Sequence, residues 1–178
     1  MEHERNEIRE MLLSGANDFS ALALRIFRLQ YHHNALYHAF CENLGRTPDR
    51  IKEVNEIPFL PVRFFKSHAV KTGCFQPELI FQSSGTTESG RSQHLVRDAS
   101  WYERISTSIF EQEYGALDEY IILALLPSYL EQGDSSLVRM VESFIGETGN
   151  SSSGFYRYDF DRLVNDLRYF LQGPKKII

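Results

Sequence analysis

Hydrophobic residues recur every three or four positions along the first 45 residues, which is the spacing of one face of an α-helix. The recurring positions are Ile8, Met11, Leu12, Leu22, Ile26, Leu29, Tyr37, Phe40, Cys41 and Leu44. Asp18 and Asn34 are suited to begin new helices within this stretch, and Gly15 and Gly45 are suited to end them. We therefore expect residues 1–46 to form a helical collar.

Residues 47–77 have no regular hydrophobic period. Pro58 and Pro61 bracket an apolar pair there, and Thr47 and Pro48 predict the cap and first turn of a short helix. The sequence predicts a connector over this stretch.

After Pro77 the pattern changes to short apolar runs that alternate with amphipathic segments, which is typical of α/β proteins. The runs predict strands at 78–82, 93–97, 119–126 and 155–158. The amphipathic segments predict helices at 100–114, 135–148 and 161–171, the first with a capping box from Ser100 to Glu103. The expected fold class is α/β, an N-terminal helical segment followed by a mixed β-sheet flanked by helices.

The last four residues, 175–178, have the pattern of a strand that is just beginning. An unpaired apolar strand at an edge promotes aggregation. We therefore expect this chain to be the N-terminal part of a longer protein, and residues 1–178 to belong to a single domain.

Length, composition and charge narrow the possible functions. A chain of 178 residues is long enough for a hydrophobic core, and its net charge of -5 argues against a nucleic-acid-binding protein. Its longest apolar run, 120–126, is too short to span a membrane, and the charged N-terminus is unlike a secretory signal. The expected location is the cytoplasm.

Neither the cysteines nor the histidines predict a metal site. Cys41 and Cys74 lack metal-binding spacing, so we expect two buried thiols. His32, His33 and His38 are spaced so that they do not lie on one helical face.

The most informative segment is Ser83–Ser92, which reads SSGTTESGRS directly after a predicted strand. Small hydroxyl residues and two glycines allow the backbone to approach an anion and to present several N–H and O–H donors. A surface loop without function has a similar composition, but the position after a strand and the order of the residues favour phosphate binding.

Gly85–Ser92 also fits the spacing of a nucleoside-triphosphatase P-loop, with Arg91 in place of the lysine. A P-loop leads directly into a helix, whereas residues 93–97 alternate like a strand. We therefore expect a loop between two strands.

This segment resembles the Ser/Thr-Ser-Gly-Thr-Thr-Gly signature of the adenylate-forming superfamily, which includes acyl-CoA synthetases and phenylacetate-CoA ligases. Two other segments, LPVRFFKSHAV before the loop and LALLPSYLEQGDSSLVRMV after it, resemble the acyl-protein synthetase (LuxE-type) branch associated with bacterial luminescence. The resemblance runs from about Phe59 to the end and implies the N-terminal domain of an adenylate-forming enzyme.

The resemblance implies ATP, Mg²⁺ and a fatty acid as the bound molecules. The residues that it assigns to the phosphates of ATP are Ser83, Ser84, Gly85, Thr86 and Thr87, with Arg91 as a weaker contact. The sequence departs from the family pattern in three ways. Glu88 replaces the usual glycine, and the usual downstream lysine is absent, which leaves Arg91 as the nearest cation. Leu130 replaces the histidine in the motif marked by Pro127 and Gly133, which borders the acyl pocket in the family; the alternative for this segment is a turn after a buried strand.

The implied reaction joins a carboxylic acid to AMP and then transfers the acyl group to a protein cysteine. An acyl reductase or an acyl carrier is the implied partner. Because the implied adenine site and catalytic lysine would follow residue 178, we expect little turnover from this chain alone. The alternatives are a ligase that uses coenzyme A as the acceptor and a non-catalytic binding or regulatory module.

Overall fold

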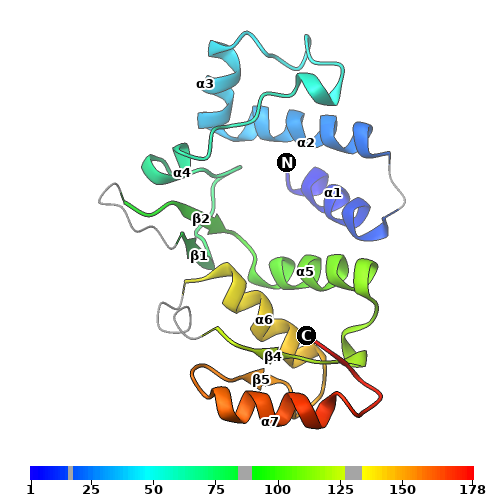
Figure 1. The fold of residues 1–178 in the computed structure, drawn as a ribbon. Coiled ribbons are helices and arrows are strands. Elements are labelled where there is room, and N and C mark those ends of the chain that lie inside the picture. The colour runs from blue at the N-terminus through cyan, green and yellow to red at the C-terminus, as the bar shows by residue number, and fades with distance from the viewer. Residues whose placement is uncertain (16–17, 84–89, 127–133) are drawn as a thin grey trace. The chain divides into compact units, whose positions relative to one another are not determined.

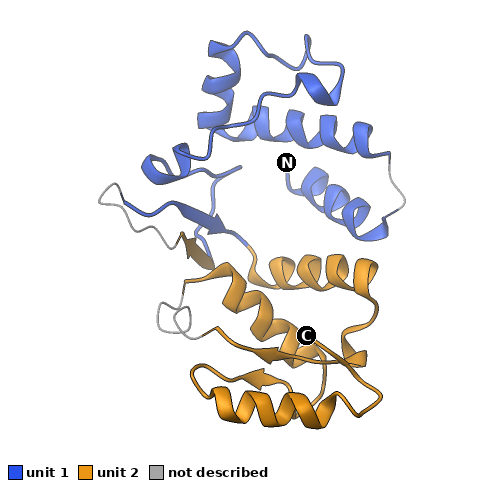
Figure 2. Cartoon of the chain, in the orientation of Figure 1, with its two compact units in different colours: residues 1–77, 85–97 blue, residues 78–84, 98–178 orange. Residues whose placement is uncertain are grey.

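The computed structural model describes residues 1–15, 18–83, 90–126 and 134–178 (Figure 1). Figure 2 shows that the chain forms two compact units. Unit 1 contains residues 1–77 and 85–97, and unit 2 contains residues 78–84 and 98–178. The end of the predicted connector therefore coincides with the end of the first continuous stretch of unit 1.

Unit 1 is mainly helical, as the hydrophobic spacing predicts. Its elements are α1 (Glu2–Ser14), α2 (Phe19–His33), α3 (Ala35–Asn43), the 3₁₀ turn η1 (Val54–Glu56), α4 (Phe64–Ser67) and β2 (Gln93–Val96). The Asp18 carboxylate caps α2 by accepting from the N–H groups of Ser20 and Ala21, at 2.8 and 3.3 Å. The predicted start of the second helix is therefore confirmed.

Asn34 separates α2 from α3 and serves both helices. Its backbone N–H bonds to the carbonyl of Gln30, and its side-chain oxygen accepts from the N–H of Tyr37 at 3.1 Å. Gly45 follows α3 with a φ of 64°, a left-handed conformation that glycine adopts at low cost. Both boundaries agree with the sequence prediction.

The larger core cluster of unit 1 is rich in aromatic side chains and consists of Phe27, Tyr31, Tyr37, Cys41 and Ile51; a second cluster consists of Ile8, Leu22 and Leu29. The rings of Phe27 and Tyr37 meet edge to face with centroids 6.1 Å apart, a favoured arrangement for aromatic pairs. The Tyr37 hydroxyl donates to the Pro58 carbonyl at 2.7 Å, so a connector residue is fixed to the core.

Three details of unit 1 differ from the prediction. Thr47 begins a turn, with its carbonyl bonded to the N–H of Arg50 and Ile51, but no helix continues from it. The connector instead contains η1 and α4. Cys41 is buried as expected, whereas Cys74 is exposed, because it lies in an irregular segment outside the core.

Charged groups hold the first turn of α1 to other parts of unit 1. The Glu2 carboxylate accepts from Arg5 at 2.6 Å and from Arg97 at 2.8 Å, and the latter residue follows β2. Arg5 also donates to the Thr72 carbonyl at 2.9 Å. These bonds lower the pKa of Glu2 below its usual range, chiefly because its charged form accepts from Arg97 and Arg5.

Unit 2 combines helices with short strands. Its elements are β1 (Leu79–Gln82), α5 (Ala99–Tyr114), the 3₁₀ turn η2 (Leu117–Glu119), β3 (Tyr120–Ile121), β4 (Leu123–Ala124), α6 (Ser136–Glu147), β5 (Gly154–Phe155), α7 (Phe160–Phe170) and β6 (Lys176–Ile177). The described residues thus have mixed helices and short strands, an arrangement compatible with the α/β class.

The apolar run predicted as one strand, 119–126, is divided between two partners. β3 pairs in parallel with β6, Tyr120 opposite Lys176, and β4 pairs in parallel with β5, Leu123 opposite Gly154. The backbone of an extended strand points its polar groups alternately to either side, so the run can bond two neighbours. The burial of Tyr120, Ile121, Ile122 and Ala124 within this run suits strands in parallel pairing.

The run packs on α5 and α6 to form the core of unit 2. This core consists of Leu117, Tyr120, Ile122, Ala124 and Phe144. Phe110 from α5 contacts the Phe144 ring with centroids 5.1 Å apart. The predicted helices at 135–148 and 161–171 are confirmed, with Ser135 and Asp159 as their N-caps.

Two boundaries in unit 2 differ from the prediction. Asp98, rather than Ser100, caps α5, because its carboxylate accepts from the Trp101 N–H at 2.9 Å; Ser100 donates its hydroxyl to the same carboxylate. The predicted strand at 155–158 is only Gly154–Phe155, since Arg157 has a φ of 53° and leaves the extended conformation.

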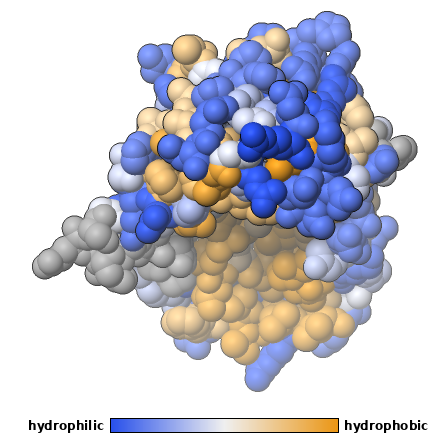
Figure 3. Space-filling model, turned by 90° about the horizontal axis from the view of Figure 1, so that it is seen from above, coloured by the Kyte–Doolittle hydropathy of each residue, from blue (hydrophilic) through white to orange (hydrophobic). Residues whose placement is uncertain are grey.

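Both hydrophilic and hydrophobic residues lie on the molecular face seen in Figure 3. The most exposed large apolar side chains are Phe59, Val62, Tyr169 and Phe19, each more than 70% exposed. None of the helices within the described ranges has the length and apolar character required to cross a membrane.

Candidate functional site

The predicted phosphate-binding segment lies between β1 and β2 in the sequence. Ser83 directly follows β1 and is exposed, and Arg91 is exposed two residues before β2. Ser84, Gly85, Thr86 and Thr87 lie outside the described residues. Because β2 is a strand, the prediction that no helix begins directly after the loop is confirmed, and the P-loop interpretation stays excluded.

β1, which leads into the segment, is fixed inside unit 2 by contacts along its length. The Phe81 ring contacts the Tyr102 ring of α5 with centroids 4.9 Å apart. The Tyr102 hydroxyl in turn donates to the Ser136 carbonyl, 3.0 Å away, at the start of α6. Just before β1, the Glu78 carboxylate accepts from the N–H of Ala99 at 2.9 Å. Ser83 therefore follows a strand that packs on α5, and α5 is in turn bonded to the start of α6.

One backbone hydrogen bond connects the two segments that sequence reasoning singled out. The Gln82 N–H donates to the Asp134 carbonyl at 3.0 Å. Gln82 immediately precedes the phosphate-binding segment, and Asp134 immediately follows the motif marked by Pro127 and Gly133, which lies outside the described residues. The residue before one motif is thus bonded to the residue after the other.

The segment after the loop contains a glycine and a histidine with distinct properties. Gly90 has a φ of 79°, which favours glycine, and a Cβ there would meet no atom within 4 Å. His94 on β2 keeps an exposed face, but desolvation of its ring lowers the pKa of the imidazole below its ordinary value. An uncharged His94 would offer a phosphate a hydrogen bond rather than a positive charge.

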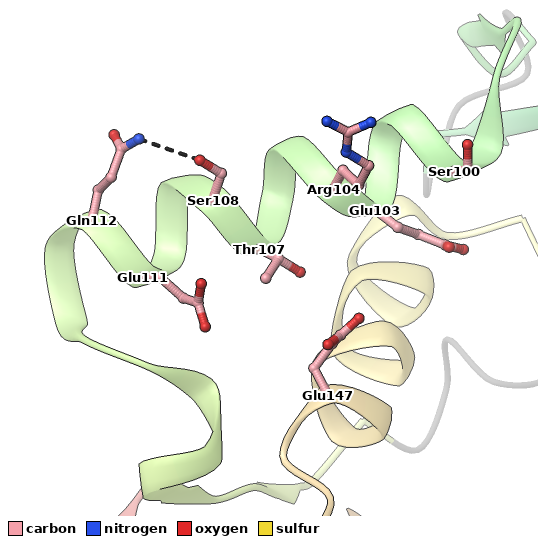
Figure 4. Close-up of a pocket in the computed structure, with 8 residues that line it drawn as sticks. All are labelled: Ser100, Glu103, Arg104, Thr107, Ser108, Glu111, Gln112 and Glu147. Atoms are coloured by element: carbon pink, nitrogen blue, oxygen red, sulfur yellow. Dashed lines mark hydrogen bonds between the residues drawn. The ribbon is translucent and has the colours of Figure 1, made fainter. Parts of the chain in front are cut away.

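A cavity of about 520 Å³ between α5 and α6 is the second candidate site in unit 2 (Figure 4). The side chains that line it are Ser100, Glu103, Arg104, Thr107, Ser108, Glu111, Gln112 and Glu147. Glu111 and Glu147 point toward the space between the helices in Figure 4. Sequence analysis missed this cavity, because its acidic residues come from helices far apart in the chain.

The charges of this cavity argue against an anionic ligand. Three glutamates and one arginine line it, and Glu103 is already paired with Arg139. Glu111 accepts from the Leu117 N–H at 3.1 Å, which joins the end of α5 to η2. An excess of carboxylates repels phosphates and fatty-acid carboxylates. We therefore do not assign the nucleotide or the acid to this cavity.

The two cysteines differ in their suitability as thiol nucleophiles. Cys41 is fully buried, and burial raises the pKa of its thiol, so the reactive thiolate is disfavoured. Cys74 is exposed. Within the described ranges, no group of three or more His, Cys, Asp or Glu side chains is arranged to hold a metal ion.

Comparison with known proteins gives one partial similarity. No family model matches the chain, and no solved structure matches it. A long-chain-fatty-acid–luciferin-component ligase from Vibrio harveyi is 31% identical to this chain over 107 residues. The alignment covers 60% of this chain and 25% of the ligase. Over that part of its length, the chain is similar to a fatty-acid ligase.

Proposed function

We propose that this chain is part of a ligase that uses ATP to activate a fatty acid as an acyl adenylate, and that Ser83–Thr87 and Arg91 bind the phosphates. The observation that carries this proposal is the Gln82–Asp134 hydrogen bond, which joins the residue before one motif to the residue after the other. The partial similarity to a fatty-acid ligase supports the substrate class.

In the proposed reaction a carboxylate oxygen of the acid attacks the α-phosphorus of ATP. The bond from that phosphorus to the bridging oxygen breaks, so acyl-AMP and pyrophosphate are formed. The hydroxyl and backbone N–H donors of the segment hold the negative charge of the departing pyrophosphate, and the Arg91 guanidinium pairs with it. Catalysis by these residues consists of placement and charge stabilisation.

Mg²⁺ would be held mainly by the phosphate oxygens. This ion prefers oxygen ligands and commonly binds through one or two carboxylates together with substrate phosphates. The ion would also reduce the repulsion between the phosphates and Glu88.

The binding step is tested by titrating the chain with ATP and Mg²⁺ in a calorimeter. A double change of Thr86→Val and Thr87→Ala removes two hydroxyl donors, and we expect affinity to fall roughly 10-fold or more, because hydrogen bonds to charged groups are strong. Thr107→Val, on α5, removes a comparable hydroxyl from the acidic cavity and serves as the matched control. Equal affinity in all three proteins would contradict the assignment.

The reaction is tested by pyrophosphate exchange with a series of carboxylic acids. We expect the chain alone to exchange slowly, and exchange at ordinary enzyme rates would contradict that expectation. Transfer of a labelled acyl group to protein, removed by hydroxylamine, indicates a cysteine acceptor, whereas consumption of coenzyme A indicates the alternative ligase. A chain that neither binds ATP nor adenylates any acid would instead fit a non-catalytic module.

A further inference from the structure

Helix α7 has an exposed apolar stripe along its whole length. The stripe consists of Phe160, Val164, Leu167 and the C-cap residue Leu171, which are 56, 44, 36 and 68% exposed. Their spacing of four, three and four residues places them on one face of an α-helix. A surface of this kind is typical of a helix that packs against another helix.

A different side of α7 holds the helix to unit 2. Leu163, Asp166 and Phe170 are half-buried, and Asp166 accepts from the hydroxyl of buried Tyr156 at 2.7 Å. Arg162 lies over the Tyr156 ring, 4.8 Å from its centroid. The packing of unit 2 thus uses the side next to the stripe and leaves the stripe itself exposed.

The charges of α7 indicate a protein partner rather than a membrane. Amphipathic helices that bind membranes are rich in lysine and arginine on their polar face. α7 instead contains two aspartates and two arginines, Asp161, Asp166, Arg162 and Arg168. Its net charge is close to zero, so it lacks the electrostatic attraction to anionic lipid.

The arrangement of Asp161 and Arg168 identifies the partner. These residues are seven positions apart, which places both on the same flank of the stripe. Among the residues that the structure describes, neither side chain forms an ion pair. When two identical helices meet antiparallel across a twofold axis, each flank faces the same flank of its partner.

We propose that α7 pairs antiparallel with α7 of a second copy of this chain. A twofold axis midway between Val164 and Leu167 places Val164 of one copy opposite Leu167 of the other. The same axis places Phe160 of one copy opposite Leu171 of the other. Asp161 of one copy then lies within about two residues, roughly 3 Å along the axis, of Arg168 of the other. The apolar stripe and the flanking charges of one copy are therefore complementary to those of a second copy.

The size of the stripe sets the strength of this association. A stable interface buries about 800 Å² on each partner, more than the four side chains of the stripe provide. The pairing is therefore weak and concentration-dependent. This inference goes beyond the proposed function and does not depend on ATP binding.

Sedimentation equilibrium of the full chain from about 1 µM to about 1 mM tests the proposal. We expect dimers to increase with concentration. Val164→Glu places a charge in the apolar stripe and should weaken association roughly 10-fold or more. Asn165→Glu adds the same charge on the exposed polar side and should leave it unchanged, and circular dichroism verifies that both variants keep their helices.

A charge exchange tests the antiparallel geometry. Asp161→Arg alone and Arg168→Asp alone each bring like charges together and should weaken association roughly 2- to 10-fold. The double variant restores opposite charges and should return the dissociation constant to within about twofold of the wild type. A monomer at every concentration, association insensitive to Val164→Glu, or monomers that bind phosphatidylserine vesicles would each overturn the proposal.

Discussion

The two units build their cores from contacts of different range. In unit 1 the two clusters of core residues lie between Ile8 and Ile51, and the helices that supply them follow one another in the chain. In unit 2 the central run from Tyr120 to Ala124 pairs with segments near residues 154 and 176. Closing a longer loop costs more conformational entropy, so unit 2 depends more on distant segments meeting correctly.

The difference also concerns what holds each unit together beside its core. Unit 1 begins its second and third helices with the caps at Asp18 and Asn34, which are local hydrogen bonds, and holds α1 by the distant bonds from Arg97 to Glu2 and from Arg5 to Thr72. Unit 2 attaches α7 through the bond from Tyr156 to Asp166, and attaches β6 through the Lys176–Glu119 pair at 2.7 Å. Substitutions at these positions test whether the distinction holds.

The largest effect is expected from Phe27→Ala in the core of unit 1. Phe27 is 2% exposed and contacts the rings of Tyr31 and Tyr37. Loss of the ring leaves a cavity, and we expect the free energy of unfolding in urea to fall by about 3–5 kcal/mol. Phe19→Ala is the matched control, because that ring is 73% exposed. Equal losses for the two variants would contradict the assigned core.

A smaller effect is expected from Tyr156→Phe in unit 2. The Tyr156 hydroxyl donates to the Asp166 carboxylate at 2.7 Å, and its loss should cost about 1.5–2 kcal/mol in urea unfolding. Tyr158→Phe, at an exposed ring, is the control. If both variants unfold at the same urea concentration as the wild type, α7 does not depend on this bond.

The same hydroxyl gives unit 2 a dependence on alkaline pH. Burial, followed by the hydrogen bond to Asp166, raises the pKa of Tyr156 to about 12, above the value of about 10 in the unfolded chain. The contribution of protonated Tyr156 to the free energy of unfolding is therefore complete below pH 10 and is lost as the pH rises toward 12. Tyr156→Phe should remove that part of the pH dependence.

The elements that the sequence predicted correctly depend on neighbouring residues. Asp18, Asn34 and Ser135 each cap a helix through an N–H group two or three positions away. Such bonds form within one turn, so the residue type at one position is sufficient to predict them. The cap of α5 was misplaced because Asp98 and Ser100 are both suitable, and only the fold shows which one accepts.

The strands were predicted less well because pairing is decided by distant partners. Nothing near residues 119–126 indicates that the run bonds two separate segments, one at residues 176–178 and the other at residues 154–156. Prediction of the candidate site from sequence is limited in the same way, because contacts between distant segments are not visible in the sequence. The order of residues in Ser83–Thr87 suggested phosphate chemistry, whereas the bond from Gln82 to Asp134 and the acidic cavity were found only in the structure.

A further test of the local character of unit 1 is Asn34→Ala. This side chain is 6% exposed and supplies the cap of α3. Losing the cap should cost about 1 kcal/mol in urea unfolding. Asn34→Ser keeps an acceptor oxygen and should recover most of the loss. If serine is no better than alanine, the side chain acts by packing and not as a cap.

The smallest expected effect separates the units by pH, because all six histidines belong to unit 1. Desolvation lowers the pKa of His94 in the folded chain, so the unfolded chain, with a pKa of about 6.5, binds the proton first. Unit 1 should therefore lose stability as the pH falls below about 6.5, while unit 2 should not respond through histidine.

Amide hydrogen exchange between pH 5 and 8, corrected for the intrinsic rate, measures the stability of both units in one sample. His94→Gln should reduce the slope for unit 1. A slope of equal size in unit 2 would assign the pH dependence to carboxylates and remove this distinction between the units.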